Sequence, residues 1–430
     1  MMALKFIIII ISIQCLVSYV SGIKSKVLLI SMDGFRWDYI QKASTPNFDE
    51  FAAMGTKADY INNTFVTKTF PCHYSIATGL YEESHGIVAN QMFDPSYPIP
   101  NNTFNMKTKD TEWWDGGEPI WVTARKNGLK SAVYFWPGSE TKIRGYRPNI
   151  WFPYDESVSF EHRINTVVSW LSDDQYDIDL ALLYFHEPDA TGHKFGPDSN
   201  EVKNKVVDMD NVLGYLMRKM TSAKLWQTTN VIVTSDHGMT EIDYATRHID
   251  LSNYIDIDQS MTYKTYGPFS NILTVDGLED EVFNNLSKAH EHMKIYRKAD
   301  IPDHWHYKNN RRILPLLAVA DEGWTIVKGP EDYNLTVKGA HGYDNRLQSM
   351  KPIFYARGPN IRSNTTAFPF NSVDIYPLIC ELLGITPAPN NGTLDNTNTF
   401  IIDNSTGSAS YTWSCSTLLT ICFIIVFLHF

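Results

Sequence analysis

Short apolar runs alternate along the chain with longer stretches in which apolar residues recur at helical spacing. Stretches 160–171 and 201–220 carry the helical pattern. The apolar runs are rich in β-branched or aromatic residues, and they are 27–30, 132–135, 181–185, 231–233 and 353–355. This alternation predicts an α/β fold with a central, mainly parallel sheet flanked by helices on both faces. In such sheets, ligands bind beyond the carboxyl ends of the strands.

The N-terminal end departs from this pattern. Lys5 precedes the apolar run 6–11, and small residues follow as far as Gly22. This arrangement predicts a signal peptide over residues 1–22 that is removed on export. An uncleaved membrane anchor is the alternative, and the shortness of the apolar run counts against it.

The C-terminal end departs from it as well. Residues 387–410 are polar and rich in Asn, Thr, Ser and Pro, whereas residues 411–430 end in an apolar run that starts at Leu418. This run is shorter than the roughly 20 residues of a spanning helix, so we interpret 387–410 as a stalk and 411–430 as a GPI-attachment signal. A single-pass transmembrane segment starting near Tyr411 is the alternative. Both interpretations place the folded region, residues 23–386, on the extracellular face of the plasma membrane.

Composition narrows the choice of partners and stabilising bonds. The 430 residues are 43% hydrophobic, which is ample for a large core, and 48 acidic against 37 basic residues give a net charge of -11. Because no Lys/Arg cluster is long enough to indicate a nucleic-acid footprint, we expect no nucleic-acid polymer as a partner. Only Cys72 and Cys380 lie in the folded region, so the fold must rest on its core, and two separate buried thiols are the simplest expectation.

The chain carries seven N-x-[ST] sequons, which agree with export and predict a glycosylated surface. They are Asn62, Asn101, Asn285, Asn334, Asn364, Asn391 and Asn404.

Acidic and histidine side chains follow three of the apolar runs, and one more histidine lies in a later Gly-rich segment. Three carboxylates at the same edge of a parallel sheet would repel one another unless cations held them. Carboxylate oxygens and imidazole nitrogens are ligands that suit Zn²⁺. We therefore predict a metal site built from Asp33, Asp189, His193, Asp236, His237 and His341.

Six motifs in order give the chain a specific resemblance. They are Met-Asp-Gly-Phe at 32–35, Lys-Thr-Phe-Pro at 68–71, His-Gly-Ile-Val-Ala-Asn at 85–90, Glu-Pro-Asp-x-x-Gly-His at 187–193, Asp-His-Gly-Met at 236–239 and Gly-x-His-Gly at 339–342. This set resembles the ecto-nucleotide pyrophosphatase/phosphodiesterase family of the alkaline phosphatase superfamily, and in particular its short, membrane-anchored members. The resemblance implies that residues 23–386 form a phosphodiesterase catalytic domain.

The resemblance also implies a role for each matching residue. One zinc ion would be held by Asp189, His193 and His341, and a second by Asp33, Asp236, His237 and the Thr69 oxygen. Thr69 would be the nucleophile, because metal coordination lowers the pKa of a hydroxyl that is otherwise unreactive. Asn90 would donate a hydrogen bond to the phosphate oxygen, and Phe70 and Tyr154 would sandwich a nucleotide base. Cys72 stands where the family pattern leads us to expect Asn.

The implied activity is hydrolysis of phosphodiester or pyrophosphate bonds of small nucleotides, with release of a nucleoside 5′-monophosphate through a phosphothreonine-linked intermediate. The alternative on the same metal site is a choline-lipid phosphodiesterase, which would need an aromatic or acidic pocket for a quaternary ammonium group. A phosphomonoesterase also stays open. A sulfatase does not, because its Cys-x-Pro-x-Arg segment is absent.

Several other polar residues have structural explanations. His304 and His306 resemble a ligand pair, but a zinc site needs at least three protein ligands. We expect His73 and His85 to be hydrogen-bonded supports beside the nucleophile segment. The remaining charges are expected to be solvated or to take part in packing; they are Glu82, Glu83, Lys308, Arg311 and Arg312.

Overall fold

The computed structural model describes residues 25–98, 102–330 and 334–402. The predicted signal peptide (1–22) and the predicted apolar tail (411–430) lie outside these ranges. Within them, no helix combines the length and the apolar character needed to cross a membrane.

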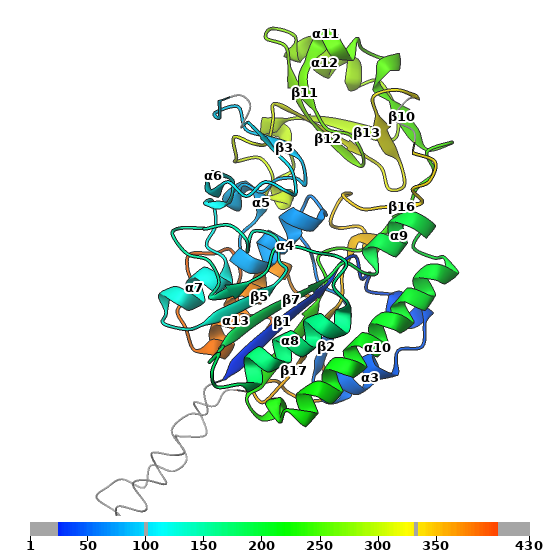
Figure 1. The fold of residues 1–430 in the computed structure, drawn as a ribbon. Helices are drawn as coiled ribbons and strands as arrows, with labels where there is room; N and C mark the ends of the chain where they lie inside the picture. The colour runs from blue at the N-terminus through cyan, green and yellow to red at the C-terminus, as the bar shows by residue number, and fades with distance from the viewer. Residues whose placement is uncertain (1–24, 99–101, 331–333, 403–430) are drawn as a thin grey trace, which may run out of the picture.

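An eight-stranded sheet with the order β18-β2-β17-β8-β1-β7-β5-β6 forms the centre of the molecule (Figure 1). Its strands are β1 (Lys26–Met32), β2 (Thr56–Ala58), β5 (Ser131–Tyr134), β6 (Ile150–Trp151), β7 (Leu180–Phe185), β8 (Thr229–Thr234), β17 (Phe354–Arg357) and β18 (Thr365–Ala367). The five predicted strands are all present. Strands β8, β1, β7, β5 and β6 run parallel, whereas β17 is antiparallel to both of its neighbours. An apolar run cannot reveal that direction, because a buried strand is apolar whichever way it runs.

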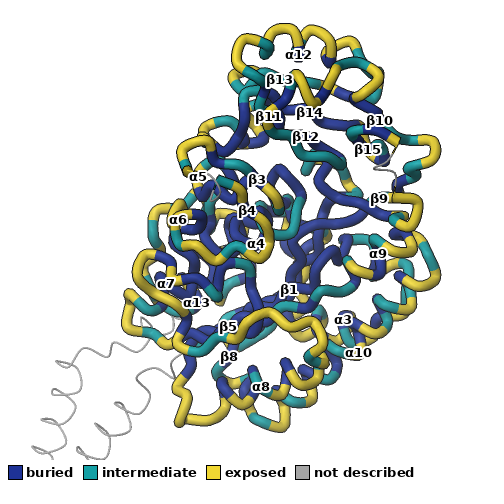
Figure 2. Tube along the Cα trace, turned by 45° about the horizontal axis from the view of Figure 1, so that its top comes forward, coloured by how far each residue is buried: buried dark blue, intermediate teal, exposed yellow. Residues whose placement is uncertain are grey.

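Strand β1 shows why these runs are continuously apolar. Val27 and Leu29 belong to one hydrophobic cluster, and Leu28 and Ile30 belong to another. Successive side chains of a strand point to opposite faces, so each face of the sheet has its own core. Helices α4 (Thr69–Thr78), α7 (Ile120–Lys126) and α13 (Ile375–Leu383) pack on the first face, and α3 (Pro46–Ala53), α8 (Phe160–Ser172) and α10 (Asn200–Ser222) pack on the second. Figure 2 shows the strands buried between helices whose outer sides are exposed.

A smaller antiparallel sheet, in the upper part of Figure 1, lies within the predicted catalytic segment. Its order is β11-β12-β14-β13, and its elements are β11 (Met261–Lys264), β12 (Phe269–Thr274), β13 (Met293–Arg297), β14 (Leu316–Ala320) and the helix α12 (Glu279–Leu286). A parallel pair, β10 (His248–Asp250) and β15 (Thr325–Val327), adjoins it. The sheet has its own core around Ile272 and Leu316. Only Met293 of β13 is buried, so no apolar run marks that strand. Strand β14 is apolar and fully buried, but the predicted strands do not include it.

Short elements complete the described part of the chain. They are α2 (Tyr39–Lys42), α5 (Glu82–His85), α6 (Thr111–Trp114), α9 (Asp189–Phe195), α11 (Ile257–Ser260), β3 (Met92–Phe93), β4 (Thr103–Phe104), β9 (Thr240–Glu241) and β16 (Gly339–Ala340).

The packed region continues beyond residue 386. Phe400 is fully buried, and its ring centroid lies 5.8 Å from that of Phe354 and 6.2 Å from that of Phe370. The backbone N–H of Ile402 donates to the Asn360 carbonyl at 2.8 Å. The segment predicted as a stalk therefore packs on the core as far as Ile402, and its remainder, 403–410, lies outside the described residues.

Candidate active site

Three carboxylates meet at one edge of the central sheet, where the sequence predicted them. Asp33 follows β1, Asp189 begins α9 after β7, and Asp236 follows β8. Because β8, β1 and β7 are adjacent, their carboxyl ends bring the three residues together. The Asp189 N–H donates to the Asp33 carbonyl at 3.0 Å, and the Gly34 N–H donates to Asp236 Oδ1 at 3.1 Å.

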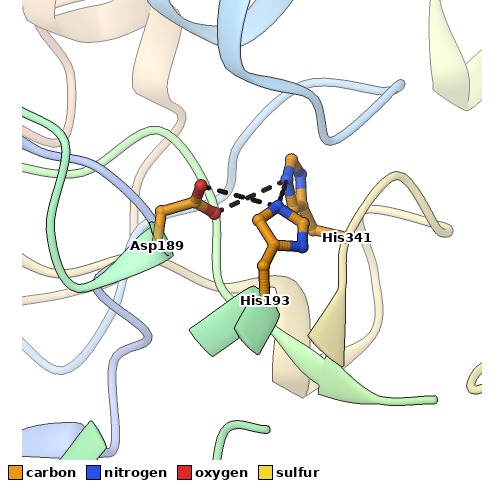
Figure 3. Close-up of side chains that lie close together, drawn as sticks. All are labelled: Asp189, His193 and His341. Atoms are coloured by element: carbon orange, nitrogen blue, oxygen red, sulfur yellow. Dashed lines mark hydrogen bonds and ion pairs between the residues drawn. The ribbon is translucent and has the colours of Figure 1, made fainter. Parts of the chain in front are cut away.

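One cluster consists of Asp189, His193 and His341 (Figure 3). Asp189 and His193 lie one turn apart on α9, and His341 follows β16. His193 Nδ1 bonds the Gly339 carbonyl at 2.8 Å, and His341 Nδ1 bonds the Thr67 carbonyl at 2.7 Å. A carbonyl oxygen only accepts, so both Nδ1 atoms carry the proton and both Nε2 atoms present a lone pair.

The two Nε2 lone pairs of His193 and His341 face each other across 3.1 Å. Asp189 Oδ2 lies 3.5 Å from His193 Nε2, and Asp189 Oδ1 lies 3.6 Å from His341 Nε2. Burial lowers the pKa of His341 well below its usual value, and the neighbouring His237, Lys68 and His193 reinforce this shift. Two imidazoles and a carboxylate converging in this way form a set of three ligands for a cation.

A second cluster surrounds the Thr69 hydroxyl. His237 Nδ1 bonds the Gly238 carbonyl at 2.9 Å, which leaves Nε2 facing the cluster. This Nε2 lies 3.0 Å from Asp236 Oδ2, 3.5 Å from Asp33 Oδ1 and 3.4 Å from Thr69 Oγ1. The three residues predicted to accompany Thr69 are therefore all within reach of its oxygen or of one another.

The pKa values of the buried carboxyls in this cluster diverge. Burial and the charges of Asp236 and Asp189 raise the pKa of Asp33 well above its usual value. Burial also raises the pKa of Asp236, but the His237 and His73 rings outweigh it and hold that pKa well below its usual value. The divergence shows that, with only protein groups around them, several negative charges close together are strongly disfavoured in this cluster.

Three carboxylate oxygens of the site are buried without a hydrogen-bond partner: Asp33 Oδ1, Asp189 Oδ1 and Asp236 Oδ2. Leaving buried carboxylate oxygens unpaired is costly, whereas divalent cations are held by such oxygens together with imidazole nitrogens. Among the described residues, Asp33 also takes part in two further groups of possible ligands, one with Asp189 and His237 and one with His73 and Asp236. The residues present therefore fit bound metal ions.

Two residues contribute more to the site than the sequence suggested. The Tyr184 hydroxyl donates to Asp33 Oδ2 at 2.6 Å, so that Asp33 Oδ1 is left to face the cluster. His73 Nδ1 lies 2.8 Å from the Thr69 carbonyl and 3.2 Å from Asp236 Oδ2, and its Nε2 pairs with the Ser31 hydroxyl at 2.8 Å. His73 is thus a support, as expected, but one that lies among the metal-ligand candidates. Tyr184 lay hidden in an apolar strand, where only its need for a hydroxyl partner could have drawn notice.

One backbone N–H links Thr69, the candidate nucleophile, to Asn90, the candidate hydrogen-bond donor to a phosphate oxygen. Thr69 begins α4, and the N–H of the next residue, Phe70, donates to Asn90 Oδ1 at 2.9 Å. The acceptor side of the Asn90 amide is therefore occupied, and its amino group is the side that can donate. The N-terminus of a helix also favours a bound anion.

The family model described as "Type I phosphodiesterase / nucleotide pyrophosphatase" matches residues 27–344, which include every residue of the two clusters. The chain belongs to this family. It is a hydrolase of the ecto-nucleotide pyrophosphatase/phosphodiesterase group in the alkaline phosphatase superfamily, as the resemblance predicted.

Similar proteins cover nearly the whole phosphodiesterase. Human ectonucleotide pyrophosphatase/phosphodiesterase family member 5 is 45% identical over 87% of this chain and 77% of its own. A bis(5′-adenosyl)-triphosphatase of Xenopus laevis is 43% identical over 86% of this chain and 80% of its own. The solved structure of the murine family member 5, as an inactive threonine-to-alanine variant in complex with AMP, has a TM-score of 0.83 and 43% identity, and it covers 88% of this chain and 100% of that chain.

A pocket of about 510 Å³ opens beside the clusters of this phosphodiesterase. Thr69, Asn90 and the aromatic residues Phe70 and Tyr154 all line it. Phe70 packs against Phe104 and Trp114, whereas Tyr154 is 47% exposed and packs edge-on against Phe135. The structure therefore brings both predicted base-binding residues to one pocket.

The other polar residues, for which we expected structural roles from the sequence, have packing partners in the phosphodiesterase. No group of possible metal ligands among the described residues includes His304 or His306, and the His306 ring stacks on Tyr81 with centroids 4.0 Å apart. Cys72 and Cys380 are free and buried, as expected. His85 Nε2 pairs with the Ser75 hydroxyl at 2.9 Å, and burial lowers the pKa of His85 to about 3, which suits a support and not a base.

The predicted glycosylation sites differ in accessibility. Asn62 is half-buried, and its side-chain oxygen accepts from Lys351 Nζ at 2.8 Å. Asn101 and Asn404 lie outside the described residues. The side chains of the other four are exposed: Asn285, Asn334, Asn364 and Asn391. Glycosylation of all seven stays a prediction.

Proposed function

We propose that this phosphodiesterase cleaves phosphodiester or pyrophosphate bonds of extracellular nucleotides and releases a nucleoside 5′-monophosphate. The observation that carries the proposal is the convergence of His and Asp ligand atoms around the Thr69 hydroxyl, with three buried carboxylate oxygens unpaired. The murine relative that binds AMP and is inactive as a threonine-to-alanine variant supports the choice of substrate and of nucleophile.

The proposed cofactors are two zinc ions. Asp189, His193 and His341 would hold one, and Asp33, Asp236, His237 and the Thr69 oxygen would hold the other. When bound, the ions supply Lewis-acid activation and a positive field for the phosphate charge. His and carboxylate ligands in sets of three or four favour zinc over magnesium or calcium, which take oxygen ligands.

The side chains of the chain perform the remaining steps. Thr69 Oγ1 attacks phosphorus, and the bond from phosphorus to the leaving oxygen breaks on the opposite side. The nucleoside monophosphate stays attached to Thr69 as a phosphothreonine ester, which water hydrolyses to restore the hydroxyl. The Asn90 amino group donates to a phosphate oxygen, and Phe70 and Tyr154 hold the base between aromatic faces.

The charges in the pocket favour a nucleotide over a choline lipid. Lys68, Lys107 and Lys109 line the pocket, and the carboxylate of Glu140 there is paired with Lys109 Nζ at 2.8 Å. The other two carboxylates of the lining, Asp33 and Asp189, are proposed metal ligands. With both ions bound, a quaternary ammonium group would therefore meet net positive charge, whereas a nucleotide brings negative phosphates. The choline-lipid activity is therefore the second candidate, on the same metal site.

The test of this function compares three substrates with equal leaving groups: p-nitrophenyl-TMP, p-nitrophenyl phosphate and p-nitrophenylphosphorylcholine. We expect the nucleotide diester to have the highest kcat/KM. We expect Thr69→Ala to abolish turnover of this substrate, whereas the melting temperature of the protein and its binding of AMP should be unchanged. Preferential turnover of the monoester or the choline ester would replace the proposed substrate class, and a near-normal rate in Thr69→Ala would remove Thr69 from the mechanism.

We propose that the enzyme acts at the cell surface through a GPI anchor. The sequence of 403–430 supports this, since a polar segment precedes a short apolar end. Phosphatidylinositol-specific phospholipase C should release the activity from intact cells expressing the full chain. Continued attachment after the enzyme has released a known GPI-anchored control protein would favour the transmembrane alternative.

A further inference from the structure

Segment 305–312 precedes β14, a strand of the smaller sheet. It lies against segment 83–94, which carries Asn90. We name these the brace segment (305–312) and the Asn90 loop (83–94). The sequence alone gave their charged and aromatic residues no part in the chemistry. The contacts between the two segments connect these residues to the catalytic groups.

Side chains of the brace segment contact the Asn90 loop on both sides of Asn90. Tyr307, which is fully buried, donates its hydroxyl to the Val88 carbonyl at 2.8 Å, two residues before Asn90. Arg312, also buried, donates from Nη1 to the Gly86 carbonyl at 2.7 Å and from Nε to Asp94 Oδ2 at 2.8 Å. The Asn90 loop is thus held before and after Asn90.

Backbone groups of the brace segment bind the start of the same loop. The N–H groups of Lys308 and Asn309 both donate to Glu83 Oε2 at 2.9 Å, and Asn310 Nδ2 donates to the Glu83 carbonyl at 3.0 Å. Glu83 therefore takes part in packing and is not a free surface charge.

The brace segment also contacts the chain that leads to the nucleophile. Trp305 stacks on Phe65 with ring centroids 4.2 Å apart and 7° between the planes, and Tyr307 meets Phe65 edge-on at 5.2 Å. Phe65 lies four residues before Thr69. The same segment therefore supports both the chain that leads into α4 and the loop that bonds the first turn of α4 through Asn90.

We infer that the brace segment, chiefly through Tyr307 and Arg312, is a positioning element that fixes the Asn90 amide relative to Thr69. This inference rests on the proposed role of Asn90 in the nucleotide phosphodiesterase. Its physical reason is that a donor must be held within a few tenths of an ångström to act on the transition state, and a loop cannot do this unaided. Neither residue touches the substrate pocket, so both act through Asn90.

Tyr307→Phe is the variant that tests the inference, because it removes one hydroxyl from the protein and leaves the edge-on ring contact with Phe65 in place. The hydroxyl also accepts from Asn271 Nδ2 at 2.9 Å. Tyr376→Phe is the matched control, since the Tyr376 hydroxyl is equally buried and likewise has one side-chain partner, Thr123, and one backbone partner, the Ala388 N–H. Thermal unfolding should report a similar loss of stability in both variants.

Steady-state kinetics with p-nitrophenyl-TMP distinguish positioning from stability. We expect Tyr307→Phe to lower kcat about five-fold with KM unchanged, and Tyr376→Phe to leave both constants unchanged. In an Asn90→Ala background, Tyr307→Phe should have no further effect, because the group it positions is absent. Arg312→Lys, which keeps the charge beside Asp94 but shortens the reach to Gly86, should behave like Tyr307→Phe.

Two outcomes would overturn the inference while the proposed function stands. One is an equal loss of kcat on Tyr307→Phe in the wild-type and Asn90→Ala backgrounds. The other is a wild-type kcat in Tyr307→Phe and Arg312→Lys while Asn90→Ala itself is slow. If Asn90→Ala turned over at the wild-type rate, the role of Asn90 would fail, and the positioning inference would fail with it.

Discussion

Each imidazole that faces the two clusters has one nitrogen bonded to a backbone carbonyl. His193, His237 and His341 all use Nδ1 for this bond, and all direct Nε2 toward a carboxylate. The fixed rings mean that the ligand nitrogens are oriented before any ion binds. Tyr184 does the same for Asp33, because it occupies one carboxylate oxygen and leaves the other.

Loss of the Asn90 donor should affect the transition state more than the bound substrate. We expect Asn90→Ala to lower kcat by about 10²–10³-fold, which is about 2.7–4 kcal/mol for one oxyanion donor. Asn90→Asp retains the acceptor for the Phe70 N–H but replaces the amino group by a charged oxygen, so it should lose at least as much. Single-turnover kinetics check both variants, and a change confined to KM would contradict the role.

At the scale of elements, adjacent parallel strands explain why the site forms where it does. β8, β1 and β7 end together, and α9 starts with one ligand and presents a second one turn later. The chain directly after β3 is fixed differently, by ionic contacts from the segment that precedes β14. Arg311 Nε and Arg312 Nε each lie 2.8 Å from Asp94 Oδ2.

The Asp94 contact gives a dependence of stability on pH. Burial raises the pKa of Asp94, but Arg311, Arg312 and Ser96 outweigh it and lower that pKa to about 2. A depressed folded-state pKa stabilises the protein above the unfolded value, about 3.9, and the contribution disappears as pH falls through about 2. The full contribution is about 2.6 kcal/mol, the linkage value for a carboxyl whose pKa falls from about 3.9 to about 2.

Denaturant unfolding of the wild type and of Asp94→Asn at pH 6, 4 and 3 checks this expectation. The difference in unfolding free energy should be largest at pH 6 and should shrink as pH falls. Other carboxylates titrate in both proteins, so the difference isolates Asp94. A difference that is constant with pH would show that the ion pairs contribute no pH-dependent stability.

At the scale of the whole molecule, the site is assembled from segments more than 300 residues apart in the chain, from Asp33 to His341. The carboxylates that meet there repel one another, so bound cations should link catalysis to the stability of the fold. The pocket lies beside these clusters and is open to a small nucleotide.

Metal removal should therefore change both activity and unfolding. We expect chelation to abolish turnover and to lower the unfolding free energy by about 2.7 kcal/mol for each ion removed, the linkage value for an ion present at roughly 100 times its Kd. Elemental analysis should give two zinc ions per chain, and added zinc should restore both properties. Turnover unaffected by chelators, in protein that contains no metal, would contradict the two-zinc proposal.

Much of the fold and the site could be predicted from the sequence, because the signals are local. Strands buried on both faces appear as continuous apolar runs, and a carboxylate or His directly after such a run must lie at the strand's end. This reasoning identified β1, β7 and β8 and the ligand candidates that follow them. The order of the motifs identified the family.

Only the tertiary structure decided how the supporting groups are used. Direction in a sheet, as for β17, leaves no trace in an apolar run, and the edge strand β13 of the smaller sheet is too exposed to form such a run. Tyr184 and Tyr307 resemble ordinary core residues until their hydroxyl partners, Asp33 and the Val88 carbonyl, are known. Such bonds join residues far apart in the chain, so they depend on the completed packing and not on any local pattern.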